Sequence, residues 1–185
     1  MSTTLAGAMF GQMSFAYAKP ATGLNDLGVQ VTDSKRMQFT TGTATANKAN
    51  RIYGDVISIA AGANTTVNLQ ALTDQLNLSC NFARIKGVYF HLISEADNAD
   101  IGTNATSILF GGNGASNQGI SGNATYGFFG NGNDTMRVFN GGFAMMGTPS
   151  AAGVLIDSTH KNVFILNEDG AVTAKVYVGF LGADA

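Results

Sequence analysis

The hydrophobic pattern is clearest in the last third of the chain, where three apolar runs follow one another. Two short runs, residues 154–157 and 162–167, precede a longer one, residues 171–181, in which apolar and polar or small residues alternate. A period of two residues is typical of a half-buried strand. Residues 167–170 end in Asp-Gly, a pair that favours a tight hairpin because glycine takes a positive φ without steric cost. We therefore predict three strands joined by short turns.

Similar runs upstream predict further short strands. In residues 82–94 the apolar positions slip from odd to even numbers, and Gly87 suits the bulge that such a slip needs. Residues 69–78 fit either a helical turn or a loop. The other strand candidates are separated by turns rich in Gly, Asn and Ala, and they are residues 52–60, 65–69, 107–110, 126–129, 136–139 and 143–146. About eight to ten short strands with turns between them predict an all-β fold, an antiparallel β-sandwich of the jelly-roll-like kind.

The N-terminal segment differs from the rest, because it shows no helical period and little structure of its own. We divide the chain into an extended N-terminal arm for attachment or oligomerisation, residues 1–45, and a β-sandwich domain, residues 46–185. Large apolar side chains on such an arm would be a liability in water, so we expect them to dock onto a neighbour. The candidate attachment residues are Met9, Phe10, Met13, Phe15 and Tyr17. The segment lacks the charged start and unbroken apolar centre of a secretory signal, so none is expected.

Composition excludes several classes of partner. Only 12% of the residues are charged, about half the usual share, and the net charge is −2. The ten Lys and Arg residues are scattered, whereas nucleic-acid binding needs them clustered, so we expect no nucleic acid. No apolar run reaches the roughly 20 residues of a spanning helix, so we expect no membrane partner. The single cysteine permits no internal disulfide, which leaves packing or oligomerisation to stabilise the domain.

Residues that could carry chemistry are few and separated. His91 and His160 lack the spacing of a metal-binding face, and Cys80 has no histidine motif beside it. Nucleophile-elbow, phosphate-loop and Cys-x-x-Cys motifs do not occur. We therefore expect no catalytic site, no cofactor and no enzymatic activity, and we expect these three side chains to lie apart.

Two loops contain clusters of Asp and Asn side chains whose oxygen atoms could bind calcium. Neither cluster follows the spacing of a calcium loop, and Asp and Asn commonly cap turns by bonding to nearby backbone. We therefore predict turn capping and no metal. The two clusters are Asp97, Asp100 and Asn104, and Asn131, Asn133 and Asp134.

The C-terminal part of the chain contains an apolar run that ends in Asn, followed by a run of alternating apolar and polar residues that ends in Gly. It comprises residues 153–157, 161–167 and 171–182. This ending resembles that of small virion proteins of tailed phages. Residues 82–94 and 108–112 are similar too, so the resemblance covers about residues 50–185. It implies a jelly-roll-like sandwich that decorates the phage capsid, typically as a trimer seated where capsomers meet.

The resemblance therefore implies a capsid decoration, or cement, protein that binds the outside of the head as a homotrimer and stabilises the shell. Its partners would be further copies of itself and the major capsid protein. It would be made in the bacterial host cytoplasm and reside on the capsid surface of the virion. Two alternatives stay open. One is a tail or receptor-binding virion protein whose loops 111–124 and 130–134 hold a sugar; the other is a carbohydrate-binding module, which the absence of Trp disfavours.

Overall fold

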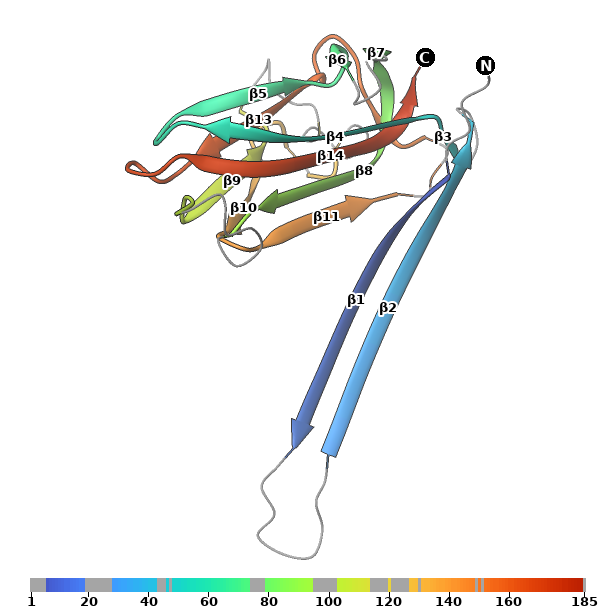
Figure 1. Cartoon of the computed structure of the whole chain (residues 1–185). Coiled ribbons are helices and arrows are strands. Elements are labelled where there is room, and N and C mark those ends of the chain that lie inside the picture. The colour runs from blue at the N-terminus through green and yellow to red at the C-terminus, as the bar shows by residue number, and fades with distance from the viewer. Residues whose placement is uncertain are drawn as a thin grey trace, which may run out of the picture.

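The computed structural model contains a β-sandwich and a long hairpin that projects from it (Figure 1). It describes residues 6–18, 28–42, 46, 48–73, 79–94, 103–113, 120, 127–129, 131–148, 150 and 152–184. Those residues form fourteen strands and no helix. The all-β prediction is therefore confirmed.

Two antiparallel sheets make up the sandwich. The β4 sheet has the order β11–β8–β14–β4 and contains β4 (Arg51–Ile59), β8 (Phe82–Leu92), β11 (Phe143–Gly147) and β14 (Ala174–Asp184), with β12 (Val154–Leu155) added beside β8. The β5 sheet has the order β10–β9–β13–β5 and contains β5 (Asn64–Asn68), β9 (Ser107–Gly111), β10 (Thr135–Phe139) and β13 (Asn162–Asn167). A small ladder pairs β6 (Leu72–Thr73) with β7 (Ser79–Cys80).

The strand pairing is that of a jelly roll. Counted from β4, the first of the eight main strands pairs with the eighth, β14, and the second, β5, with the seventh, β13. The third, β8, pairs with the sixth, β11, and the fourth, β9, with the fifth, β10. All four pairs are antiparallel, so the chain follows a long hairpin that is rolled into two sheets. The predicted jelly-roll-like sandwich is confirmed.

The bulge predicted beside Gly87 is also present. In the ladder between β8 and β14, Leu181 lies opposite Gly87 and Gly182 lies opposite Ile85, so Lys86 is the extra residue. An extra residue shifts the alternation by one position. Ile85 and Val88, three residues apart, therefore both point into the core, where each is at most 1% exposed.

The tight hairpin predicted at residues 167–170 is wrong. β13 pairs only within the β5 sheet and β14 only within the β4 sheet, so the segment between them crosses from one sheet to the other. Gly170 does not take a positive φ. Asp169 caps the crossing instead, because its Oδ1 accepts hydrogen bonds from the backbone N–H groups of Ala171, at 2.9 Å, and Val172, at 3.1 Å.

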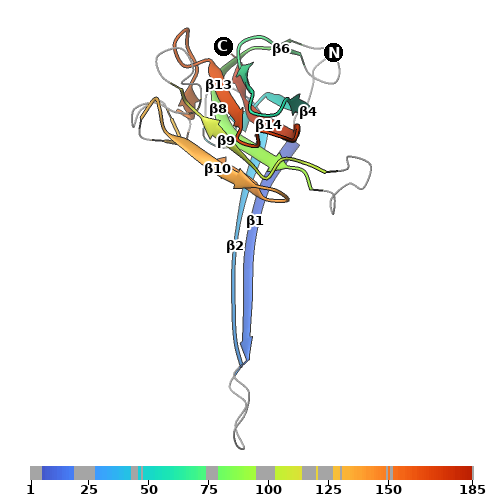
Figure 2. The ribbon, with the colours of Figure 1, turned by 90° about the vertical axis from the view of Figure 1, so that its left-hand side faces the viewer.

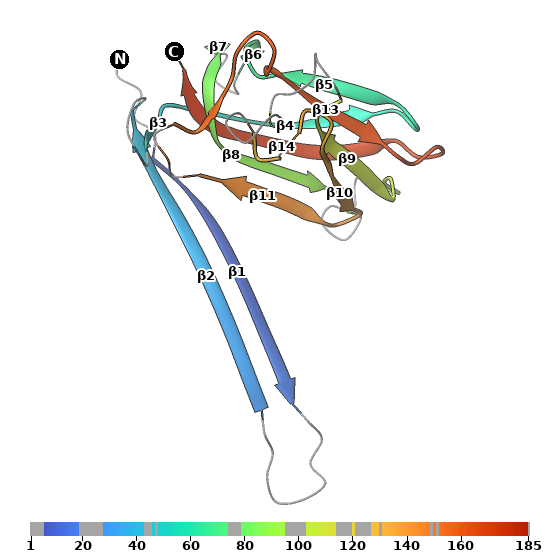
Figure 3. The same cartoon turned by 180° about the vertical axis from the view of Figure 1, so that it is seen from behind.

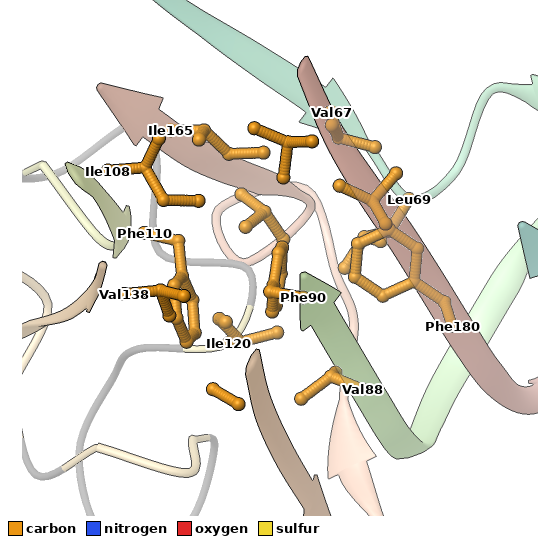
Figure 4. Packing of buried hydrophobic residues seen from close by; sticks show 14 of the residues in the cluster. Val67, Leu69, Val88, Phe90, Ile108, Phe110, Ile120, Val138, Ile165 and Phe180 are labelled. Carbon is orange, nitrogen blue, oxygen red and sulfur yellow. The ribbon is translucent and has the colours of Figure 1, made fainter. Parts of the chain in front are cut away.

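A core of aliphatic and aromatic side chains fills the space between the sheets (Figure 4). Phe90 of the β4 sheet stacks on Phe110 of the β5 sheet with their ring centroids 4.0 Å apart. Phe180 meets the edge of Phe90 at 5.8 Å. All three side chains are at most 1% exposed, so the two sheets are joined mainly by apolar burial.

An ion pair links the crossing segment to the edge of the β5 sheet. Arg137 on β10 donates two hydrogen bonds of 2.6 Å to the carboxylate of Glu168, and the Ser107 hydroxyl donates a third at 2.9 Å. The bonds from Arg137, followed by that from Ser107, hold the pKa of Glu168 below its ordinary value of 4.5, although burial opposes them. Glu168 therefore stabilises the fold most in its ionised form.

This shift predicts an acid-sensitive contribution to stability. A carboxyl whose pKa is lower in the folded state stabilises the fold above its unfolded pKa, and that stabilisation is lost as the pH falls through the folded value. Thermal melts of Glu168→Gln should therefore show a modestly lower melting temperature than the parent at neutral pH. The difference should shrink as the pH falls below the ordinary pKa of Glu168. A difference that stays constant down to the acid range would contradict this prediction.

The N-terminal arm is a β-hairpin. β1 (Ala6–Ala18) and β2 (Gly28–Thr41) are antiparallel and in register from Ala6–Thr40 to Ala18–Gly28. The two strands run away from the sandwich in all three views (Figures 1, 2 and 3). The arm is extended, as predicted, but the expectation that it has little structure of its own is wrong.

The root of the arm is fixed to the end of β14. Phe39, Ala49 of β3 (Lys48–Ala49) and Leu181 form a separate buried cluster, with Met37 packed against it. Nearby, Asp184 binds Arg51 in an ion pair of 2.6 Å, and its carboxylate also accepts a hydrogen bond from the Asn50 amide. The Asp184 backbone N–H donates to Asn50 Oδ1 at 3.0 Å. These contacts hold the start of the hairpin against the sandwich.

Candidate docking groove at the root of the arm

The outer face of the β4 sheet is unusually rich in glycine and aromatic residues. Alternate residues of β14, such as Val178 and Phe180, are buried in the core, so the residues between them lie on the outer face. The strand register aligns those residues in three rows across β4, β14, β8 and β11. The rows are Val56–Tyr177–His91–Phe143, Gly54–Gly179–Tyr89–Met145 and Ile52–Leu181–Gly87–Gly147.

An apolar groove of about 300 Å³ lies on this face beside the arm. The sheet surface is hollowed at Gly87 and Gly179, because glycine has no side chain to fill it. Phe10 of β1 lines the groove from the side of the arm. The other lining side chains come from the sandwich and include Ile52, Tyr53, Tyr89, Met145, Tyr177 and Leu181.

Tyrosine rings form the groove's aromatic border. A side-chain carbon on Gly54 would lie only 2.4 Å from the Tyr177 hydroxyl, so glycine at this position lets the Tyr177 ring lie across β4. Tyr89 meets Tyr177 edge-on with centroids 5.8 Å apart, and Tyr89 is 6.0 Å from Phe143. These contacts hold the rings in place, which reduces the entropy that a bound partner would have to remove.

The groove is electrically neutral. Among the described residues that line it, none carries a charged side chain. Burial raises the pKa of Tyr53 to about 12, and the neighbouring Asp55 carboxylate, whose Oδ2 accepts a 3.3 Å hydrogen bond from the Tyr53 hydroxyl, adds to this effect. The phenol therefore stays protonated at physiological pH. A groove of this kind suits apolar or aromatic side chains of a partner.

One predicted attachment residue lies at this groove. Phe10 is 56% exposed and borders it. The backbone of Met9, Met13, Phe15 and Tyr17 belongs to β1, and their side chains lie outside what the structure describes. An attachment role for these five residues stays a prediction.

Sequence reasoning missed the part of the groove that the sandwich supplies. From the sequence, Gly87 indicated only a bulge and Gly179 only a small residue in an alternating strand. The register of three strands shows that these two glycines and Gly54 lie close together. The sequence did contain one signal of this surface. A glycine and a tyrosine lie two residues apart at Gly87 and Tyr89, and again at Tyr177 and Gly179. Such pairs lie on the same face of a strand.

The structure places the three residues considered for catalysis in different elements. His91 lies on the outer face of β8 beside Tyr89, with ring centroids 6.2 Å apart. Cys80 is buried in β7, where its thiol contacts the Ile52 carbonyl oxygen at 3.6 Å. His160 lies in a loop, and its Nδ1 is 2.8 Å from the Asp157 carboxylate. None of the three lines the groove.

The described oxygen donors are engaged in turns and strand connections. Asn104 is buried; its Oδ1 accepts from the Lys175 N–H at 2.9 Å, and its amide donates to the Lys175 and Ile93 carbonyls. Asn131 Oδ1 accepts from the Asn133 N–H at 3.2 Å, and Asp134 Oδ2 accepts from the Asn131 N–H at 2.9 Å. Asp97 and Asp100 lie outside the described residues. In the part of the chain that is described, no group of three or more His, Cys, Asp or Glu residues could hold a metal ion.

The chain matches no protein-family model, no curated protein and no solved structure. Within the described ranges, no helix is long and apolar enough to cross a membrane. The fold, the arm and the groove are therefore the features from which a function can be inferred.

Proposed function

We propose that this protein is a structural component of a tailed-phage virion, a decoration protein that binds the outside of the head as a homotrimer and stabilises the shell. One observation carries the proposal: a jelly-roll sandwich bears a projecting two-stranded arm, and an uncharged apolar groove lies at the root of that arm. An isolated two-stranded hairpin is at best marginally stable in water. An arm of this length therefore calls for a protein surface that covers it.

Exposed apolar side chains extend the groove into a larger docking surface. Ile52, Val56 and Phe143 are each about half exposed or more, and all three lie on the outer face of the β4 sheet. Contiguous apolar surface of this kind marks interaction sites. We infer that an apolar segment of the major capsid protein occupies the groove. A neutral groove has little charge to desolvate on binding, and three linked copies would gain further affinity by avidity.

The aromatic residues on the outer face of the β4 sheet favour a second candidate function. In this alternative the protein binds glycans, as a receptor-binding virion protein or a carbohydrate-binding module. Tyr89, Tyr177 and Phe143 lie close enough together to stack on a sugar ring. The described groove lining, however, offers few polar groups to fix sugar hydroxyls. A protein partner therefore fits the groove better than a glycan does.

The test uses phage particles produced by the host that carries the gene. Gold-labelled antibodies against the full chain should decorate the heads of these particles in electron micrographs. The purified chain should also rebind heads stripped of it and sediment with them. Labelling of tails alone, or of no particles, would overturn the head-decoration proposal, and binding to a glycan array with no binding to heads would favour the second candidate.

A variant that fills the groove tests whether the groove is needed for binding to the head. At Gly179 a side-chain carbon would meet Tyr177 and Tyr89 at 3.5 Å, which is ordinary contact, so Gly179→Leu should fold and place the rest of its side chain in the groove. We expect it to lose at least about tenfold in head binding, the loss that corresponds to about 1.4 kcal/mol. Co-sedimentation with stripped heads measures the loss.

The matched control is Gly170→Leu. A side-chain carbon at Gly170 would meet nothing within 4 Å, and this residue lies in the crossing segment outside the groove. The control should bind heads like the parent. If Gly179→Leu and the parent bind heads equally, and circular dichroism shows that both are folded, the groove is not part of the attachment surface.

A further inference from the structure

The two faces of the arm differ sharply in composition. In an antiparallel pair, opposite residues lie on the same face and successive pairs alternate between faces. One set of pairs, which we call the apolar face, is Gly7–Phe39, Met9–Met37, Gly11–Lys35, Met13–Asp33, Phe15–Val31 and Tyr17–Val29. The other set, the polar face, is Ala6–Thr40, Ala8–Gln38, Phe10–Arg36, Gln12–Ser34, Ser14–Thr32, Ala16–Gln30 and Ala18–Gly28.

At the root of the arm, the apolar face is already packed against protein. Phe39 is 1% exposed in its cluster with Ala49 and Leu181, and Met37 packs against the same cluster. On the polar face at the same level, Gln38 and Thr40 are exposed. At the root, the apolar face therefore packs on protein, whereas Gln38 and Thr40 of the polar face are exposed and Phe10 of that face borders the groove.

The apolar face continues beyond the root, where the ribbon leaves its own sandwich. Five of its distal positions, 13, 15, 17, 29 and 31, hold Met, Phe, Tyr, Val and Val. Figures 1 and 2 show this half of the ribbon running away from the two sheets. A cover for this half must therefore come from outside the sandwich that bears it.

We propose that this cover is the same face of the arm in other copies of the chain, so that the arms together form the shared stalk of a homotrimer. Around a symmetry axis each copy presents identical positions, so the apolar stretch of one arm meets an equally apolar stretch of the next. The face holds one lysine, at position 35, and one aspartate, at position 33, so its net charge is zero. The same symmetry places the Lys35 positions of the copies at one level of the stalk and the Asp33 positions at the next level of this face, so the charges of the packed faces sum to zero.

This inference builds on the homotrimer of the proposed function, but its test needs no phage particle. Full-length variants that carry one cysteine on the arm are treated with a short bis-maleimide cross-linker. Met13→Cys and Phe15→Cys lie on the apolar face, and Ser14→Cys, between them, is the matched control on the polar face. The native Cys80 is fully buried and adds no accessible thiol.

Most of the Met13→Cys and Phe15→Cys protein should become covalently dimeric, because one cysteine per chain joins two of the three arms. Little of the Ser14→Cys protein should do so. Equal cross-linking on both faces, or none in any variant, would overturn the proposal. A failure here would leave the particle-labelling result untouched, so the two proposals fail separately.

A second pair of variants tests the same face by light scattering. Phe15→Asp places a charge on the apolar face and should reduce the measured mass from three copies to one, whereas Ala16→Asp on the polar face should leave it unchanged. The circular dichroism spectrum of the sandwich should stay the same in both. A Phe15→Asp protein that keeps the parent's mass but no longer binds stripped heads would show that the apolar face contacts the capsid instead, and would contradict the proposal.

Discussion

Replacing Asn167 with alanine should lower the melting temperature by about 10 °C, the expected effect of losing about 4 kcal/mol in a chain of this size. Asn167 is fully buried at the end of β13. Its amide donates hydrogen bonds to the carbonyls of Ile59 at 3.2 Å, Ala60 at 3.1 Å and Val172 at 2.8 Å. Its Oδ1 also accepts a bond from the Asp169 N–H at 3.0 Å.

The expected loss is large because the Asn167 side chain is fully buried and its bonds to the carbonyls of Ile59, Ala60 and Val172 are buried or partly buried. Each buried polar group left without a hydrogen bond costs about 1–3 kcal/mol. The bonds of Asn167 also join the end of β4 to the segment that crosses from β13 to β14, so the substitution loosens a connection between the two sheets. Differential scanning calorimetry on the full chain measures the change.

Asn133→Ala is the matched control. Asn133 lies in an exposed turn, where its backbone N–H makes the hydrogen bond that shapes the turn. Surface substitutions of this kind usually stay within about 0.5 kcal/mol, so its melting temperature should change by no more than about 2 °C. Equal melting temperatures for the two variants would show that the buried amide of Asn167 does not stabilise the crossing.

The strands of the sandwich could be predicted because their signals are local. In β14, Ala174, Val176, Val178 and Phe180 alternate with half-buried residues, and that alternation depends only on which face of one strand meets the core. The bulge in β8 could be predicted for the same reason, since a slip in the alternation beside Gly87 is visible within a single run.

The connection between β13 and β14 could not be predicted from local turn chemistry. Asp169-Gly170 is a good hairpin pair, yet both flanking strands are buried, and the partner of each is decided by packing against distant strands. The strongest hint was Asn167 itself, a polar residue that ends an apolar run. A buried amide in such a place needs several backbone partners, which a crossing between sheets supplies.

The arm illustrates a second limit of sequence reasoning. Gly7, Gly11 and Gln12 interrupt the apolar residues of β1, so the strand looks irregular when it is read alone. Its two-faced character emerges only when β1 is set in register with β2 across the hairpin. The groove depends in the same way on three paired strands, which is why Gly179 could not be assigned to it from the sequence.

Removing the distal part of the arm should convert the protein from a trimer to a monomer. Met9 and Met37 are register partners, so a two-residue Asn-Gly turn can join them in place of residues 10–36. Phe39, Ala49 and Leu181 remain, so the root of the arm keeps its packing. The sandwich core takes no residue from the deleted segment, and its melting behaviour should therefore persist.

The mass of the full chain and of this shortened chain, measured side by side by multi-angle light scattering, tests the central claim most directly. The full chain should have three times its monomer mass of 19.1 kDa, and the shortened chain should have the mass of one copy. A full chain that is monomeric at micromolar concentration in physiological salt, or a shortened chain that remains trimeric, would contradict an arm that holds the copies together.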